Sequence, residues 1–372
     1  MPFHFIRSTY FLVLCNALVF TACQSKSKVG LSNPSTSDEK GLLFQSELAL
    51  SSIDSFVRSQ QNIHEIPAVS LALIKDGTIV YFKNYGVINS DTKVAVSEES
   101  VFEAASITKP VFAYTVCKLA QKKLIDLDKP MHERFPFPED DIQKYPCYKN
   151  MTPRHVLTHT SGLNNWGVEL NHCPGEKFGY SGQGFEFLTK ALAQSFTEEM
   201  DRKIMKYLKE EVLIPFDMNS TFFIESDTLK ARCVTGHLEG TPQAQIFPES
   251  PEMAYGMHSN AEDIAKFAIG LLNRDGLSDA MSTDFFQFHT LLETDQKEYK
   301  SDYDQAYGLG IYLRDSPYGM VFGHSGSNYD FKCLFEVYDQ LKMGYVIMTN
   351  SDTGDLLNNQ IAKFLIEGIR EH

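Results

Sequence analysis

The sequence predicts an α/β fold in which one antiparallel β-sheet is built from both ends of the chain and flanked by helices. Strand-like runs, rich in β-branched and aromatic residues, gather near the two ends, at 68–85 and 308–350. The middle of the chain, about residues 111–290, carries mostly helical and loop patterns and predicts a helical insertion. Antiparallel meanders argue against a doubly wound parallel sheet.

The N-terminal part of the fold begins with a predicted helix over about 44–62. Its apolar residues fall on one helical face: Leu50, Ile53, Phe56 and Val57. Two strands follow, at 68–75 and 78–85, and Asp76-Gly77 between them is a strong hairpin signal.

The C-terminal part contains four further predicted strands, at 308–313, 320–322, 331–338 and 344–350, and a helix from 355 to the end. We therefore expect one domain over 44–370. Its α/β part takes residues 44–110 and 291–370, and its helical part takes 111–290.

Composition sets broad limits on function. The chain has 372 residues, of which 43% are hydrophobic and 22% charged, so it can bury a sizeable core. The net charge of -14, with no cluster of Lys and Arg, argues against a nucleic-acid partner. The glycine-rich motifs that bind nucleotides are absent from the sequence, so no nucleotide cofactor is expected.

The first 43 residues are predicted to serve export rather than folding. Residues 1–22 have one cation, Arg7, and an apolar run at 11–20 that is too short to span a bilayer, as in a signal peptide. The ending Phe20-Thr21-Ala22-Cys23 resembles a bacterial lipobox, so Cys23 is the expected lipid anchor and 23–43 a flexible tether. The alternative is an ordinary signal peptide cut nearby. Either way we expect an exported protein of the cell envelope, facing the periplasm or the cell surface.

Five cysteines follow Cys23, namely Cys117, Cys147, Cys173, Cys233 and Cys333. Export permits disulfides, but the odd count leaves at least one thiol free and no spacing demands a pair. Buried, unpaired cysteines are the favoured interpretation. A zinc or redox motif of the C-x-x-C kind is absent from the sequence.

A serine and a lysine three residues apart, Ser106 and Lys109, precede a helical pattern. Pro110 is tolerated only in a first helical turn, so Ser106 belongs at the helix start. Residues three apart share a helix face, which lets the Lys109 amine reach the Ser106 hydroxyl. A serine needs a base to become a nucleophile, and a lysine serves when burial lowers its pKa. On its own this pair recurs by chance in most chains of this length.

The surrounding residues make the pair specific. Eight segments, in order along the chain, resemble the serine β-lactamase and penicillin-binding-protein-like family on its class C side, which includes D,D-carboxypeptidases and β-lactamase-fold esterases. The segments are VFEAASITKP from Val101, MTPRHVLTHTSGL from Met151, YSG from Tyr180, PFDMNST from Pro215, YGMHSNAEDIAKF from Tyr255, YGLGIYL from Tyr307, FGHSGSN from Phe322 and GYVIMTN from Gly344. This resemblance implies a β-lactamase/transpeptidase-like fold and a serine hydrolase that acts on a small-molecule or peptide substrate without cofactor or metal.

The resemblance also implies roles for individual residues. Ser106 matches the nucleophile, Lys109 its partner, and Tyr180 the tyrosine that shares general acid and base duty. The third motif of the family corresponds to His324, Ser325 and Gly326, on a strand that lines the site. The backbone N–H groups of Ser106 and Ser327 would form the oxyanion hole.

Two positions depart from the family pattern. His324 stands where lysine is common, and Gly182 stands where the family has an asparagine that orients amide substrates. We therefore expect esters to be hydrolysed faster than β-lactams. Gly182 also keeps open the alternative of a binding protein that retains the fold without turnover.

Other candidate sites are weaker. His155 and His159 have zinc-like spacing on one expected helix face, but the metalloprotease motif needs Glu at 156, where Val156 stands, so a structural role near the site is favoured. The nucleophile elbow G-x-S-x-G lacks its last glycine at both 179–183 and 323–327. Trp166, the only tryptophan, fits either the site entrance or core packing equally well.

Overall fold

Strands from the two ends of the chain pair side by side in one antiparallel sheet, as predicted. In the part of the chain that the structure describes, the sheet has eight strands in the order β2-β1-β12-β11-β10-β9-β8-β7. The strands are β1 (Ala68–Lys75), β2 (Thr78–Gly86), β7 (Thr290–Leu291), β8 (Gln305–Tyr307), β9 (Tyr312–Arg314), β10 (Val321–Ser327), β11 (Lys332–Tyr338) and β12 (Met343–Thr349). The ends of the chain meet where β1 pairs with β12, with Val69 opposite Thr349.

This computed structural model describes residues 41, 43 and 50–366, apart from 134, 136, 138, 168, 195–199 and 299–302. The predicted signal peptide at 1–22, the lipidation site Cys23 and most of the tether to residue 43 lie outside the described residues. None of the described helices is long and apolar enough to cross a membrane.

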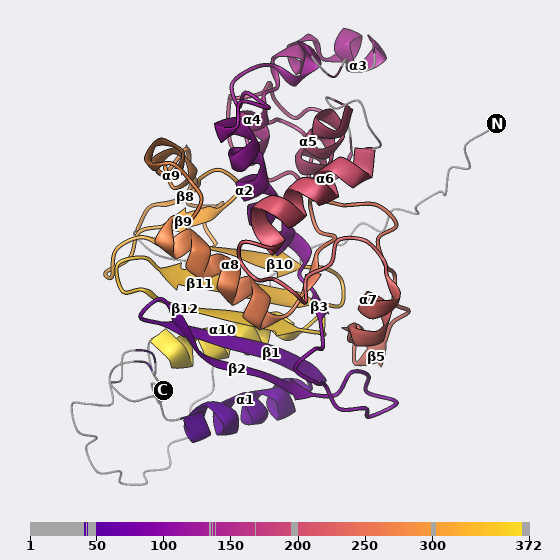
Figure 1. The fold of residues 1–372 in the computed structure, drawn as a ribbon, viewed down its shortest axis with the longest axis vertical. Coiled ribbons are helices and arrows are strands. Elements are labelled where there is room, and N and C mark those ends of the chain that lie inside the picture. The colour runs from indigo at the N-terminus through magenta and orange to yellow at the C-terminus, as the bar shows by residue number, and fades with distance from the viewer. Residues whose placement is uncertain are drawn as a thin grey trace, which may run out of the picture. The chain divides into compact units, whose positions relative to one another are not determined.

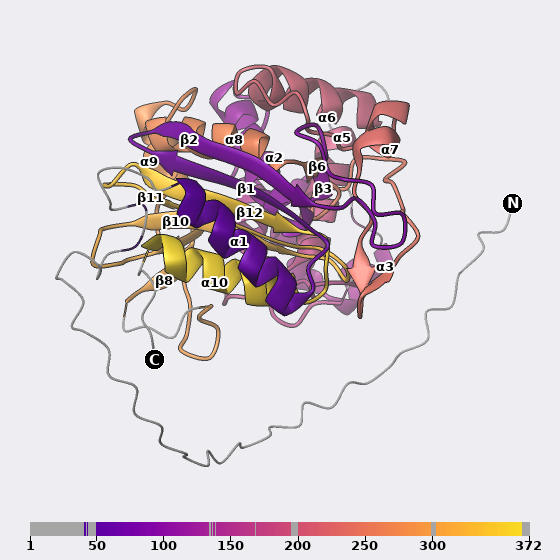
Figure 2. The same cartoon turned by 90° about the horizontal axis from the view of Figure 1, so that it is seen from below.

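Helices cover both faces of the sheet (Figures 1 and 2). The helices α1 (Leu50–His64) and α10 (Gly354–Ile366) lie against each other on one face, where Phe56 stacks on Phe364 with ring centroids 4.2 Å apart. The helix α8 (Ala261–Asn273) packs on the opposite face, against β1, β2, β11 and β12. Each face has its own hydrophobic core, and the larger one lies on the α8 side and continues into the helical part.

The helical part is carried by α2 (Thr108–Gln121) and by shorter helices between β2 and β7. These are α3 (Glu139–Lys144), α4 (Pro153–Leu157), α5 (Gly182–Gln194), α6 (Met200–Leu208), α7 (Asp227–Arg232) and α9 (Asp279–Phe285). Two short pairs join them: β3 (Phe102–Glu103) with β6 (His258–Ser259), and β4 (His237–Leu238) with β5 (Thr241–Pro242). The described residues between 41 and 366 form one compact unit.

The structure corrects two boundaries of the predicted strands. Of the strand expected at 308–313, only residues 312–313 belong to a strand, because residues 308–311 form the tight turn between β8 and β9. The strand expected at 320–322 continues to Ser327. Its polar second half, His-Ser-Gly-Ser, lacks the apolar alternation that marks a strand in sequence.

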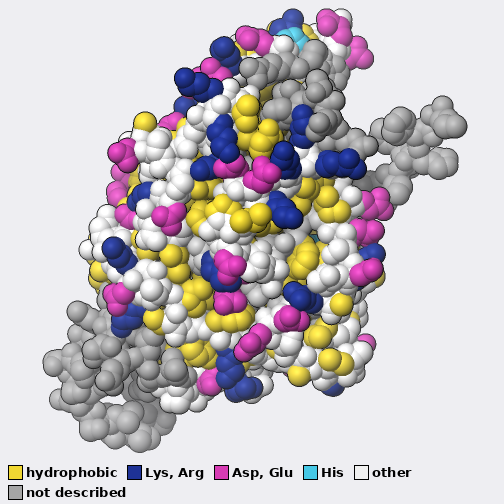
Figure 3. All heavy atoms as spheres, in the orientation of Figure 1, with side chains coloured by type: hydrophobic (Ala, Val, Ile, Leu, Met, Phe, Trp, Pro, Cys, Tyr) yellow, Lys and Arg dark blue, Asp and Glu magenta, His cyan; other side chains and the backbone are white. Residues whose placement is uncertain are grey.

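The structure also corrects the interpretation of the cysteines. Cys147 and Cys173 form a disulfide, whereas Cys117, Cys233 and Cys333 are buried and free as expected. The bond ties the segment after α3 to the loop before Tyr180. On the face drawn in Figure 3, basic and acidic side chains are interspersed with apolar ones.

Candidate active site

Ser106 lies in a tight turn that leads straight into α2. A 3₁₀ turn at Ala105–Ile107 precedes the helix, so the predicted position at a helix start is confirmed. Ala105 has a φ of +47°, a left-handed conformation that costs a residue with a side chain about 1–3 kcal/mol. The Thr108 hydroxyl holds the turn, because it donates to the Ala105 carbonyl at 2.5 Å and accepts from the Met257 N–H at 3.1 Å.

Lys109 reaches back one turn to the serine. Its Nζ lies 3.0 Å from Ser106 Oγ and donates to the carbonyl of Ala254 at 2.7 Å. The side chain is only 1% exposed and forms no salt bridge with any described carboxylate. Burial therefore lowers the pKa of Lys109 to about 7, although Glu186 partly opposes the shift. An amine in this state exists substantially in its neutral, basic form at neutral pH.

Tyr180, which the family resemblance singled out, lies beside Lys109 and Ser106. Lys109 Nζ lies 4.9 Å from the centroid of the Tyr180 ring, and the ring stacks on His159 at 4.3 Å. Burial raises the pKa of Tyr180, while a hydrogen bond to Ser106 lowers it in part. The phenol is thus held in its protonated form beside the serine.

The two histidines considered for zinc have separate structural roles. α4 ends at Leu157, so His155 and His159 do not share a helix face, contrary to expectation. His155 belongs to a capping box, in which its Nδ1 accepts from the Thr152 N–H. His159 is buried behind Tyr180, and its Nδ1 accepts from the Ser181 N–H at 3.2 Å. His159 therefore supports the tyrosine, as the favoured structural interpretation held.

The predicted third motif divides between the two sides of β10. Ser325 and Ser327 are exposed and line the cavity at Ser106. Gly326 is buried, and a Cβ there would lie 2.3 Å from the carbonyl oxygen of Ala104, so only glycine lets the strand approach the nucleophile turn this closely. His324 is also buried and is not among the cavity-lining residues; burial and the nearby Lys109 lower its pKa to about 3.

An open cavity of about 480 Å³ surrounds the Ser106 hydroxyl, large enough for a small organic substrate. Its wall combines the predicted polar residues with aromatic side chains. The lining residues are Ser106, Lys109, Asn165, Trp166, Phe178, Tyr180, Tyr255, Leu292, Gln296, Glu298, Tyr307, Ser325, Ser327 and Asn328. Apart from Tyr180, the aromatic members were not predicted as site residues, because aromatic residues in a sequence are equally compatible with core packing.

The loop 164–166 closes one side of this cavity. Trp166 is 55% exposed and packs edge-on against Tyr255, with ring centroids 5.3 Å apart, so of its two predicted roles the structure favours the entrance. Gly182 lies beneath the indole: a Cβ there would lie 2.9 Å from Trp166 Cη2. Gly182 does not have a positive φ, so a side chain at this position would meet the indole, and the Asn165 carbonyl oxygen at 3.3 Å, without backbone strain.

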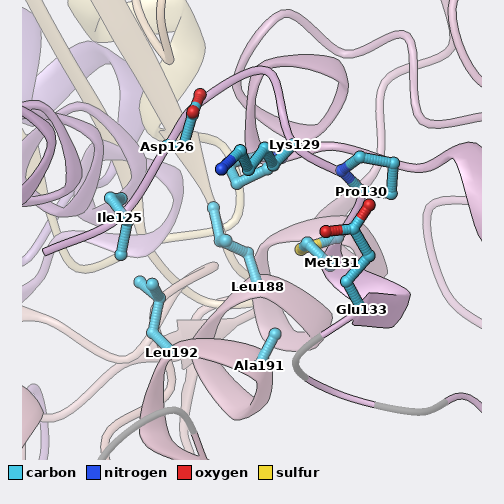
Figure 4. A pocket seen from close by; sticks show the side chains of 10 residues that line it. Ile125, Asp126, Lys129, Pro130, Met131, Glu133, Leu188, Ala191 and Leu192 are labelled. Carbon is cyan, nitrogen blue, oxygen red and sulfur yellow. The ribbon is translucent and has the colours of Figure 1, made fainter. Parts of the chain in front are cut away.

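A second, smaller hollow lies away from Ser106, in the helical part (Figure 4). Its volume of about 40 Å³ is too small for a substrate, and it shares no lining residue with the Ser106 cavity. The lining residues are Ile125, Asp126, Lys129, Pro130, Met131, Glu133, Pro153, Leu188, Ala191 and Leu192. Among the described residues, no group of three or more His, Cys, Asp or Glu side chains is placed to hold a metal ion.

Curated relatives of this chain are distant in sequence. Protein flp of Staphylococcus aureus strain MRSA252 is 24% identical over 355 residues, covering 85% of this chain and 64% of that protein. This chain thus spans less than two thirds of the length of that relative. Penicillin-binding protein 4* of Bacillus subtilis strain 168 is 22% identical over 336 residues, covering 78% of this chain and 69% of that protein.

Solved structures share the fold. An octameric penicillin-binding protein homologue from Pyrococcus abyssi superposes with a TM-score of 0.72 at 22% identity, covering 85% of this chain and 77% of that one. The D-alanine carboxypeptidase AmpC from Burkholderia cenocepacia superposes with a TM-score of 0.69 at 15% identity, covering 84% of this chain and 99% of that one. These likenesses confirm the predicted α/β fold. Residues 53–366 match the family model described as Beta-lactamase, and the chain therefore belongs to the beta-lactamase family.

Proposed function

We propose that this protein is a serine hydrolase that cleaves an ester or amide through an acyl-enzyme on Ser106. Lys109 acts as the base and Tyr180 as the acid. The observation that carries the proposal is the 3.0 Å distance between Lys109 Nζ and Ser106 Oγ, made by an amine whose pKa burial lowers to about 7. A base whose pKa lies near the working pH suits proton transfer in both directions.

The proposed acylation step transfers, in net terms, one proton from Ser106 to the leaving group and exchanges one bond at the carbonyl carbon. The Ser106 hydroxyl proton passes to the neutral Nζ of Lys109 while Oγ bonds to the substrate carbonyl carbon. The bond from that carbon to the leaving group then breaks. The leaving group takes the phenolic proton of Tyr180, and the tyrosine regains a proton from the Lys109 ammonium.

Deacylation repeats these steps with water. The neutral Lys109 takes a proton from the attacking water, the new C–O bond forms, and the bond to Ser106 Oγ breaks as Oγ recovers a proton. The backbone N–H groups of Ser106 and Ser327 are proposed to hold the developing oxyanion. The presence of Ser327 in the cavity wall supports this role.

The test is covalent labelling of the purified protein. A fluorophosphonate probe, followed by intact mass and peptide mapping, should place one adduct on Ser106, and Ser106→Ala should remain unlabelled. A p-nitrophenyl acetate assay should show turnover by the wild type that Ser106→Ala lacks. A folded wild-type protein that neither forms an adduct nor turns over the ester would instead be the non-catalytic binding protein that Gly182 left open.

A further inference from the structure

We propose that Glu186 is a positioning residue for Lys109, the proposed base. In this assignment, which rests on the serine-hydrolase function above, the Glu186 carboxylate holds the turn whose carbonyl accepts from Lys109 Nζ. Its negative charge also sets the pH range in which Lys109 acts as a base. Glu186 is not among the residues that line the Ser106 cavity, so it acts through Lys109 rather than on the substrate.

A chain of hydrogen bonds leads from Glu186 to the nucleophile. Glu186 Oε1 accepts from the Ala254 N–H at 2.8 Å. The Ala254 carbonyl accepts from Lys109 Nζ at 2.7 Å, and Nζ lies 3.0 Å from Ser106 Oγ. Both backbone groups of Ala254 are therefore engaged, one by Glu186 and the other by Lys109.

The turn around Ala254 depends on Glu186 for one of its buried polar groups. Met253 and Ala254 are fully buried, and the Glu252 carbonyl closes the turn by accepting from the Gly256 N–H at 2.8 Å. The described partner of the Ala254 N–H is the Glu186 carboxylate. Without it a buried N–H is left unpaired, and the turn has to shift to find another acceptor. Such a shift would move the carbonyl that binds the base.

The chain around the start of α5 brings three side chains to this part of the site. Tyr180 lies two residues before the helix, and its ring centroid is 4.9 Å from Lys109 Nζ. The ring centroid of Phe185, in the first turns of α5, is 5.6 Å from the same Nζ. Glu186 is the next residue of the helix. The groups that surround the amine and the group that holds its acceptor are thus fixed by one segment of the chain.

Glu186 also supplies the charge that acts on the amine. Burial lowers the pKa of Lys109 to about 7, and the Glu186 carboxylate partly opposes this shift. The other described titratable groups around the amine are Tyr180, His159 and His324. Burial raises the pKa of the tyrosine and lowers that of each histidine, so all three are neutral at pH 7.

Glu186 itself titrates in the same range as Lys109. Burial raises the pKa of Glu186 to about 7, and the nearby Glu252 raises it further. Its backbone hydrogen bond, Lys190 and Lys109 act in the opposite direction. Tyr255, another titratable neighbour, is neutral because burial raises its pKa. Two interacting groups of this kind titrate as a pair, and the ionised carboxylate favours the protonated amine. Removal of the charge should therefore leave Lys109 neutral at lower pH.

A purely structural role for Glu186 predicts different behaviour. If the residue only paired the buried Ala254 N–H, any side-chain acceptor would serve equally well. Glu186→Gln keeps an oxygen that can accept this hydrogen bond but carries no charge. The pH dependence of the reaction would then stay as in the wild type. Glu186→Ala would lower stability without changing kcat of the folded molecules.

The experiment compares pH profiles of p-nitrophenyl acetate hydrolysis from pH 5 to 9. In Glu186→Gln, the midpoint of the acid limb of kcat/KM should move to lower pH by roughly 0.3–1 pH unit, while kcat on the plateau stays within about threefold of wild type. In Glu186→Ala, the plateau kcat should fall by roughly 10- to 100-fold, because the base is no longer held in place. Glu139→Gln, the same change at an exposed carboxylate of α3, should leave both quantities unaffected.

Fluorophosphonate labelling of Ser106 over the same pH range measures the midpoint independently of ester binding. An unchanged or raised midpoint in Glu186→Gln would overturn the assignment, and so would a folded Glu186→Ala variant with the wild-type plateau kcat. If the alanine variant does not fold, the glutamine variant decides alone. A wild type without Ser106-dependent turnover or labelling refutes the hydrolase function itself. Wild-type turnover with an unchanged midpoint in Glu186→Gln refutes only the role of Glu186, so the two failures are distinguishable.

Discussion

Two clusters of polar side chains in this protein have opposite effects on the charged forms of their titratable groups. Under α1, on the outer side of β1 and β2, Asp54 Oδ1 accepts from the hydroxyl of Tyr81 at 2.7 Å, from Lys83 Nζ at 2.8 Å and from the hydroxyl of Tyr85 at 2.9 Å. These contacts lower the pKa of Asp54 to about 2. The surroundings of Asp54 therefore stabilise its charged form and favour folding.

The active site destabilises its charged forms instead. Burial lowers the pKa of Lys109 to about 7, and His159 and His324 each have a buried Nε2 without a described hydrogen-bond partner. Ala105 and His159 both have positive φ values. Strained backbone and poorly solvated titratable groups are typical of functional sites, where reactivity depends on groups that water no longer stabilises. If the proposed function is right, the groups that react and the groups that stabilise the fold lie in different parts of the molecule.

The largest effect is expected from Ser106→Ala. Removal of a nucleophile lowers kcat by about 10⁶ in a well-studied hydrolase, because no other group can form the acyl-enzyme. We expect a comparable loss of ester turnover, with an unchanged circular dichroism spectrum. Ser55→Ala, an exposed serine on α1, is the matched control and should retain full activity. Substantial turnover by a folded Ser106→Ala protein would refute the proposed mechanism.

Lys109→Met should lower activity and raise stability together. Loss of the base costs roughly 10²–10⁴ in kcat. Burial in the folded state lowers the pKa of Lys109 from 10.5 to about 7. This shift corresponds to a cost of about 5 kcal/mol in the free energy of folding at neutral pH. That exceeds the roughly 1–3 kcal/mol lost when the Ala254 carbonyl becomes unpaired. The melting temperature should therefore rise, and a clear decrease would show that Lys109 stabilises the fold.

Breaking the Cys147–Cys173 disulfide should lower the free energy of unfolding but leave ester turnover by the folded protein unchanged. The two residues are 26 apart, and closing a loop of this length stabilises the folded state by about 3 kcal/mol in the chain-entropy model. Urea unfolding of the double Cys→Ser variant should show this loss. Added reductant should destabilise the wild type to the same extent but leave the variant unchanged; equal sensitivity of both proteins would contradict the prediction.

The pH profile should identify the base. If neutral Lys109 takes the serine proton, kcat/KM should rise about tenfold per pH unit below pH 7 and level off above it, because its pKa is about 7. The measurement is p-nitrophenyl acetate hydrolysis from pH 5 to 9, corrected for the uncatalysed rate. A profile that is flat across this range would exclude Lys109 as the titrating base.

The smallest effect is expected from Asp54→Ala, which should lower the free energy of unfolding by about 1–2 kcal/mol. The effect is small because 37% of the side chain is exposed, so that solvent screens its interactions. Because folding lowers the pKa of Asp54, its contribution is present above pH 3.8 and is lost as the pH falls through about 2. Urea unfolding at pH 7 and pH 2 measures this difference, and kcat for esters should not change. A loss of stability that persists undiminished at pH 2 would contradict this account.

Sequence reasoning succeeded where the signal is local. The Asp76-Gly77 turn signal predicted the bounds of β1 and nearly all of β2 correctly. The spacing of Ser106 and Lys109 correctly predicted that the two side chains meet within one helical turn. Tyr180 was found only through the resemblance to the family. The hydrogen bond between the Gly182 N–H and Asn165 Oδ1 joins two segments that are 17 residues apart and meet only in the folded chain. The disulfide was missed for the same reason, since nothing in the local sequence specifies the partner of a cysteine.

The pairing of β1 with β12 has a consequence for how the protein is made. Ala68 donates to Asn350, 282 residues further along the chain. At about 5–20 residues per second, synthesis of the intervening chain takes roughly 15–60 seconds. During that time β1 has no β12 to pair with, and β1 is among the most buried segments of the folded sheet. An apolar strand edge therefore stays unpaired until β12 has been made, and an unpaired edge of this kind is prone to aggregation.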